Sequence, residues 1–288
     1  MNEQKTNPLG TEKISNLLLR FAIPSIIAMV VSALYNMVDQ FFIGRSVGML
    51  GNAATNFAFP LVITCTAIAL MCGVGGAANF NLCMGQQEKE EAASFAGNAI
   101  TMLFSLGMIL CIITRLFLKP MMILFGATSS VLDYSLIYTG ITSLGFPFLI
   151  LTTGGTNLVR ADGSPKFSMT CTLTGAIINT ILDPLFIFGL NLGIKGAAIA
   201  TIISQTLSAA YVFYFLRKKA ELKVRVLSKG EWKACRDDAK NIVSLGSAGF
   251  IMQLTNSLVT ICCNSVLSGI GGDVYISVMT IVSSVRQM

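Results

Sequence analysis

The sequence predicts an all-α polytopic membrane protein. Hydrophobic residues make up 53% of the 288 residues and charged residues only 12%, which is roughly half the charged fraction of an average soluble domain. Long apolar runs recur along the whole chain and are separated by short polar breaks. A run of about twenty apolar residues is long enough to cross a bilayer as a helix. We therefore expect a bundle of membrane-spanning helices.

The first apolar run covers residues 16–43 and follows a polar tail at residues 1–15. It is too long for the apolar core of a signal peptide, so we expect it to remain in the membrane as a span. The next spans are expected at residues 53–84, 93–118, 131–153, 167–190, 194–216 and 242–270, and the start of an eighth near Val274.

Lysine and arginine are concentrated in alternate breaks between these spans. One set of breaks includes the N-terminal tail and most of the basic residues, whereas the other set holds only Arg45, Arg115, Lys119 and Lys195. Cytoplasmic loops carry the excess of basic residues in multi-pass proteins. The pattern predicts a cytoplasmic N-terminus and a first span that runs outward, with an external loop at residues 44–52.

The longest break, residues 218–240, is basic and carries scattered apolar residues. We interpret it as a cytoplasmic linker that lies on anionic headgroups. A regulatory or nucleic-acid-binding segment is the alternative. The expected organisation is a cytoplasmic tail (1–15), a six-helix lobe (16–217), this linker, and the start of a second lobe (241–288).

The segment after the linker repeats the plan of the first two spans. Each copy has an apolar helix, a glycine-rich turn and a second apolar run, and the glycines at 269–272 match Gly48 and Gly51. The position of Asp39 falls on Cys262 or Cys263 in the second copy. Transporters are commonly built from repeated halves. On this interpretation roughly four further spans are missing, and the chain is a fragment of a longer protein.

Two residue types limit the chemistry of the chain. There is no histidine, which excludes histidine-based acid–base catalysis and histidine-ligated zinc. The eight cysteines form no CxxC pair and lie mostly inside apolar runs, where cysteine behaves as a small hydrophobic residue. We expect neither a disulfide nor a cysteine metal site.

Asp39 lies near the outer end of the first expected span, and Pro24 lies nearer its start. An ionisable residue inside a membrane span normally faces the bundle interior and is a functional candidate. Tyr35 precedes Asp39 by one helical turn and shares its face. The alternative is that Asp39 only reaches the membrane interface.

The fifth expected span carries a second carboxylate within Asn179-Thr180-Ile181-Leu182-Asp183-Pro184. Asn179 and Asp183 are separated by one helical turn and share a face. Pro184 cannot donate a backbone hydrogen bond, and the residue before a proline is biased away from helical geometry. The sequence predicts a helix that is broken at Asp183 and has a free backbone carbonyl nearby, as in many ion-coupled transporters. The alternative is a proline kink without an ion site.

The depth of each group in the membrane indicates which of them can meet. Counted from the outer ends of their spans at about 1.5 Å per residue, Asp39 lies roughly 6 Å deep and Tyr138, Asp183 and Thr201 roughly 10 Å deep, which predicts one outer layer of polar residues. This layer contains Tyr35, Asp39, Tyr138, Asn179, Asp183 and Thr201. Carboxylate, amide and hydroxyl oxygens suit a proton or Na⁺ rather than zinc or copper. Two neighbouring carboxylates also disfavour double ionisation, which suits reversible protonation.

Five segments resemble the multidrug and toxic compound extrusion (MATE) family, closest to its bacterial MepA-like branch: NMVDQFFIGRSVGMLGNAATNFAFPL, MGQQEKEEAA, RADGSPKF, NTILDPLFIFG and GIKGAAIATIISQ. The resemblance spans the whole chain. It implies about twelve helices in two lobes, so that this chain is truncated at its C-terminal end. It also implies a cation and proton site formed by Asp39, Asn179, Asp183 and Thr201, and a bend of the first helix at Pro24.

The sequence therefore predicts a secondary antiporter of the bacterial cytoplasmic membrane. It would export hydrophobic or cationic compounds in exchange for H⁺ or Na⁺, as a monomer in contact with lipid, without enzymatic activity, cofactor or nucleic-acid partner. Asp39, Asn179, Asp183 and Thr201 would bind the coupling ion, Tyr35 and Tyr138 would support the carboxylates, and Pro24 and Pro184 would kink the helices. The alternatives are a lipid-linked saccharide flippase, an intramembrane aspartyl enzyme and a membrane scaffold.

Overall fold

The computed structural model describes residues 13–220 and 232–286, and its regular structure in these ranges is entirely helical. Seven of the described helical segments are long and apolar enough to cross a membrane. This confirms the predicted all-α membrane fold. The helices are α2 (Ile14–Val47), α3 (Met49–Gly85), α4 (Lys89–Leu116), α5 (Leu118–Leu124), α6 (Leu132–Thr142), α7 (Phe146–Ala161), α8 (Pro165–Pro184), α9 (Ile194–Lys218) and α10 (Trp232–Arg286), with short 3₁₀ and π segments at Ser143–Gly145 and Leu185–Gly189.

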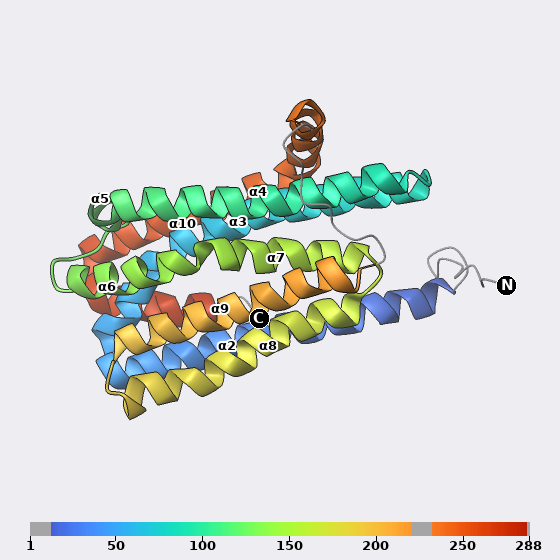
Figure 1. Cartoon of the computed structure of the whole chain (residues 1–288). Helices are drawn as coiled ribbons and strands as arrows, with labels where there is room; N and C mark the ends of the chain where they lie inside the picture. The colour runs from blue at the N-terminus through green and yellow to red at the C-terminus, as the bar shows by residue number, and fades with distance from the viewer. Residues whose placement is uncertain (1–12, 221–231, 287–288) are drawn as a thin grey trace.

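The long helices lie side by side and run up and down one bundle (Figure 1). α3 packs against α4, α7 and α10, and α8 packs between α2 and α9. At one end of the bundle lie the start of α2, the α7–α8 connection and the end of α9; at the other lie the α2–α3 and α8–α9 connections. Residues near the end of α2 and the end of α8 are thus placed in the same layer.

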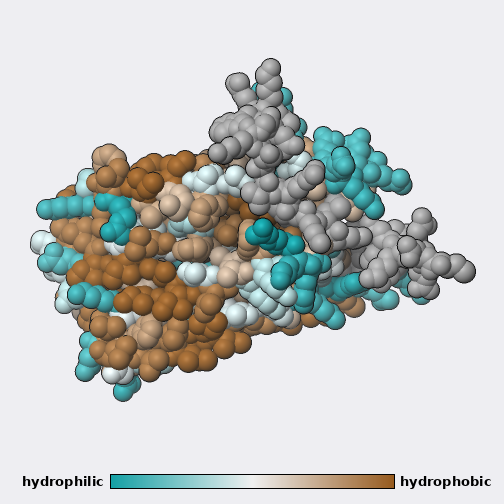
Figure 2. All heavy atoms as spheres, viewed as in Figure 1, coloured by the Kyte–Doolittle hydropathy of each residue, from teal (hydrophilic) through white to brown (hydrophobic). Residues whose placement is uncertain are grey.

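The bundle surface is apolar where a membrane would cover it. Figure 2 shows a broad hydrophobic surface over the helices, with hydrophilic residues at both ends of the bundle. Large side chains such as Ile109, Ile112 and Ile181 are exposed on this surface. In a soluble protein so much exposed apolar surface would promote association, whereas in a bilayer the lipid chains cover it.

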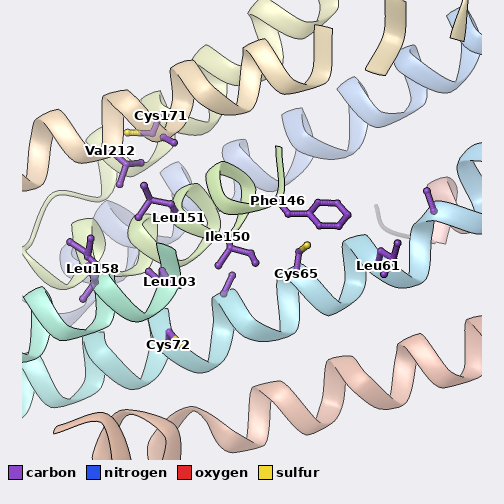
Figure 3. Close-up of a cluster of buried hydrophobic side chains, with 14 of the residues drawn as sticks. Leu61, Cys65, Cys72, Leu103, Phe146, Ile150, Leu151, Leu158, Cys171 and Val212 are labelled. Atoms are coloured by element: carbon purple, nitrogen blue, oxygen red, sulfur yellow. The ribbon is translucent and has the colours of Figure 1, made fainter. Parts of the chain in front are cut away.

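The core is formed where α3, α4 and α7 meet. Figure 3 shows Leu103, Ile150 and Leu158 among the clustered side chains between these helices, and all three are buried. α3 and α7 cross at a pair of glycines, because a Cβ atom added to Gly73 would lie 2.5 Å from the Cα atom of Gly154. Small residues let membrane helices approach closely, where van der Waals packing replaces the hydrophobic effect as the driving force.

The crossing of α3 with α10 is equally close. A Cβ atom on Gly75 would overlap the backbone oxygen of Ile242, and a Cβ atom on Gly246 would overlap the backbone oxygen of Met71. Farther along the same pair of helices, Asn56 Nδ2 donates to Asn264 Oδ1 at 3.1 Å, and both side chains are buried. The first helix after the basic segment is thus packed firmly onto the first six spans.

Two glycines, Gly48 and Gly272, form turns with nearly the same backbone angles. The first turn joins α2 to α3, and the second joins the two parts of α10. Gly48 separates α2 from α3 with φ 76° and ψ −157°, and Gly272 interrupts α10 with φ 60° and ψ −152°. Positive φ values of this kind favour glycine. Cys263 stands at the same distance before Gly272 as Asp39 stands before Gly48. The shared turn supports the internal repeat, and the division into two lobes stays a prediction.

The connection predicted as a loop over residues 44–52 is much shorter in the structure, whereas its external position stays a prediction. α2 continues to Val47 and α3 begins at Met49, so Gly48 alone makes the turn. The fourth span is also longer than predicted, because the polar residues after Thr153 do not end it. The hydroxyl of Thr156 and the amide of Asn157 both donate to the Thr153 carbonyl. The helix satisfies its own polar groups and continues to Ala161.

The end of the predicted linker is helical as well. Residues 221–231 lie outside the described part of the chain, but α10 already begins at Trp232. Asp238, which the sequence places in the linker, accepts hydrogen bonds from Asn98 Nδ2 at 2.6 Å and Ser94 Oγ at 3.0 Å. A tertiary contact with α4 therefore holds this charged segment in a helix. A short helix, α5, also follows α4 where the sequence predicts only a polar break.

Candidate functional site

The predicted carboxylates Asp39 and Asp183 come from two neighbouring helices, α2 and α8. Both side chains are buried, with 7% of Asp39 and none of Asp183 exposed. The two carboxyl groups lie close enough to influence each other electrostatically. Their proximity favours a shared proton or a bound cation, because two ionised carboxylates repel each other strongly in a medium of low dielectric constant.

Each carboxyl group also has one oxygen without a hydrogen-bond donor. Among the residues that the structure describes, no donor reaches Asp39 Oδ1 or Asp183 Oδ2. Unsatisfied buried polar atoms are costly and are rare in native proteins. Two such atoms on facing carboxyl groups are what a proton or a small cation would satisfy.

Asn179 lies one turn before Asp183 on α8 and is also buried. Its Nδ2 donates to Asp183 Oδ1 at 3.2 Å. This bond holds one oxygen of Asp183 in place and leaves the amide oxygen of Asn179 for another partner. The i to i+4 spacing of the sequence produces the contact directly.

The two tyrosines of the predicted network also lie close to the carboxylates. Tyr35 comes from α2 and Tyr138 from α6, and both interact electrostatically with Asp39 and Asp183. Tyr138 is buried and Tyr35 half-buried. The two phenol groups thus approach the carboxylates from two different helices, α2 and α6.

Thr201 is held differently from the other predicted residues. It is half-buried on α9, and its hydroxyl donates to the Ala197 carbonyl of the same helix at 2.9 Å. In the described structure no hydrogen bond joins Thr201 to either carboxylate. The oxygen of this hydroxyl keeps its lone pairs and can still accept a hydrogen bond from a protonated carboxyl group or bind a cation.

Both prolines lie inside continuous helices. α2 runs through Pro24, and the bend predicted there stays a prediction. α8 includes both Asp183 and Pro184, and the chain then widens into a π-helical turn at Leu185–Gly189. The predicted break at Asp183 is therefore wrong. A wider turn accommodates the missing amide of a proline without unwinding the helix, which is a common adjustment in membrane helices.

The sequence did not reveal the polar contacts that join α10 to the first six spans. Asn264 pairs with Asn56, and Asp238 pairs with Ser94 and Asn98. The only signal was the presence of single polar residues in apolar runs. Such residues mark helix contacts in membranes, but the sequence does not identify their partners.

Comparisons with known proteins give one consistent result. The profile of the MatE family matches residues 24–185. The chain is 28% identical over 272 residues to the multidrug export protein MepA of Staphylococcus haemolyticus, covering 94% of this chain and 60% of MepA. It is 29% identical to the FAD transporter of Shewanella oneidensis, covering 85% and 54%.

Solved structures agree with the sequence comparisons. The structure of the MATE multidrug transporter DinF-BH, in complex with a small molecule, matches with a TM-score of 0.88 and 35% identity, over 98% of this chain and 63% of that one. An inward-facing MATE transporter matches with a TM-score of 0.80 and 26% identity, over 91% and 59%. The chain thus spans about 54 to 63% of the length of these four relatives.

Proposed function

The chain belongs to the MatE family of multi-pass membrane transporters, and from this membership we propose that it forms the ion-coupling lobe of a drug exporter. The family consists of transporters rather than enzymes, which sets aside the intramembrane aspartyl enzyme. The proposed substrates are hydrophobic or cationic compounds, in line with the multidrug transport that the names of MepA and DinF-BH state for those proteins. The proposed driving force is the entry of H⁺ or Na⁺.

The observation that carries this proposal is the buried pair Asp39 and Asp183. Without a bound ion, two charges would have to be held in the membrane interior, where each costs at least about 2.5 kcal/mol. Binding of a proton or Na⁺ removes part of that cost. A ligand shifts a conformational equilibrium only by its different affinity for the two states. An ion that binds this pair in one arrangement of α2 and α8 therefore drives the bundle toward that arrangement.

Efflux from proteoliposomes tests the proposal. A full-length transporter that contains this chain should expel the cationic dye ethidium when a pH or Na⁺ gradient is imposed, and should not expel it when the gradient is collapsed with an ionophore. Comparison of the two gradients identifies the coupling ion. Efflux that persists without either gradient would contradict the proposal.

FAD export is the second candidate, because the Shewanella relative is named a FAD transporter. FAD carries a pyrophosphate, which a transport pathway must neutralise with cationic groups. The same proteoliposomes loaded with FAD decide between the two substrates. Gradient-driven release of FAD without release of ethidium would replace the drug-export proposal.

Thr201→Ala should weaken coupling moderately. Loss of one neutral oxygen ligand corresponds to about 1 kcal/mol, which is roughly a fivefold change. We expect about a fivefold higher Na⁺ requirement if Na⁺ is the coupling ion, or a displaced pH profile if H⁺ is. The matched control is Thr206→Ala, because Thr206 bonds the Ile202 carbonyl of the same helix in the same way. Equal effects of both substitutions would show that Thr201 is not a ligand.

The orientation of the chain is a further part of the proposal, with the N-terminus in the cytoplasm. Ser46, at the end of α2, is exposed and lies at the opposite end of the bundle from the exposed Gln86. A cysteine at position 46 should react with a membrane-impermeant maleimide in intact cells, in a background whose own cysteines are replaced. A cysteine at position 86 should react only after permeabilisation. The reverse pattern would overturn the orientation.

A further inference from the structure

A basic cavity opens at the end of the bundle opposite the carboxylate pair. It measures about 600 Å³ and lies where α2 and α8 begin and α9 ends. Arg20, Lys166 and Lys219 line it, one from each of these chain segments, and all three are exposed. The described residues that line the cavity include no acidic side chain. The charged side chains among the described lining residues are therefore all basic.

The cavity wall is aromatic as well as basic. The ring of Phe167 stacks on Tyr211 with 4.6 Å between centroids, and Lys219 Nζ lies 5.6 Å from the centroid of the Phe167 ring. The positive end of the α8 helix dipole opens at the same place, because Pro165 and Lys166 form its first turn. Positive charge from three side chains and one helix end therefore converges on a single cavity, which favours an anion.

We propose that this cavity binds the phosphate headgroup of an anionic phospholipid. Basic pockets between membrane helices on the cytoplasmic side bind such headgroups. Asp162 directly precedes Gly163, the first lining residue of the α7–α8 connection. Its carboxylate is not among the groups that line the cavity. The site does not depend on the transport function, because it requires only that this end of the bundle lies at a membrane surface.

The surface next to the cavity distinguishes a lipid from a free phosphate. One turn from Tyr211 toward the middle of the bundle lies Leu207, which is 44% exposed, and two turns from Thr170 lies Ile177, which is 55% exposed. Residues at these spacings share a helix face. Acyl chains attached to a headgroup in the cavity would continue over this apolar surface, whereas a free phosphate would leave it unused.

Native mass spectrometry of the purified chain in detergent tests the proposal. We expect dioleoylphosphatidylglycerol to remain bound under conditions that remove dioleoylphosphatidylcholine. Lys166→Gln with Lys219→Gln should weaken phosphatidylglycerol binding roughly 25-fold, or about fivefold for each charge removed. The matched control is Lys119→Gln with Lys195→Gln, which removes two exposed lysines at the other end of the bundle and should leave binding unchanged.

Three results would overturn the proposal. The first is equal retention of the two lipids, and the second is an equal loss of binding in the control variant. The third is competition by sn-glycerol 3-phosphate at the concentration of the lipid, which would assign the cavity to a free phosphate. If the double variant does not fold, Lys219→Gln alone should still weaken binding about fivefold, and unchanged binding would contradict the proposal.

Discussion

Gradient-driven efflux of ethidium should fall about 100-fold when Asp39 and Asp183 are both replaced by asparagine in a full-length transporter that contains this chain. Asparagine keeps the size of the side chain but cannot change between a charged and a neutral form. A charge in the membrane interior costs about 2.5–3.5 kcal/mol, which corresponds to roughly a 100-fold effect. Each single substitution should also reduce efflux strongly, because the pair acts as a unit.

Efflux from proteoliposomes under an imposed pH or Na⁺ gradient measures this effect. Asp133→Asn is the matched control, since Asp133 is exposed in the first turn of α6 and should tolerate the same chemical change. The amount of protein in the membrane should be equal in all variants. Wild-type efflux from the double variant would remove the proposed coupling mechanism.

Gly246→Ala should destabilise the protein by about 1–3 kcal/mol, which is the usual cost of overpacking. A Cβ atom at this position overlaps the backbone of Met71 on α3, and a backbone atom cannot move aside as a flexible side chain can. The two helices must therefore separate, and the contacts along the α3–α10 crossing weaken. The predicted consequence is a drop of several degrees in the apparent Tm of the purified protein.

Gly249→Ala, one turn later on the same helix, is the matched control. A Cβ atom there would lie 3.6 Å from the Leu70 Cβ atom, which is an ordinary contact. Alanine is the better helix former by about 1 kcal/mol, so this substitution should leave the Tm unchanged or raise it. Similar losses of stability in both variants would show that the close crossing is not what holds α10 to α3.

The positions of the spans could be predicted because a membrane imposes a simple rule on the sequence. Backbone polar groups must be satisfied inside each span, so long apolar runs become helices. The boundaries were wrong where local chemistry decided them: Gly48 made a turn of one residue, and Thr156 and Asn157 bonded their own helix. Hydropathy does not record either effect.

The sequence alone determined the membrane class, the family resemblance and the local pair Asn179 and Asp183, because one helical turn joins that pair. It also placed Asp39 and Asp183 at a similar depth. Only the tertiary structure decided that these carboxyl groups face each other, that Thr201 bonds its own helix, and that α10 packs on α3 through glycines. The physical reason is that chain position along a span gives depth, whereas the rotation of each helix is set by the packing of its neighbours.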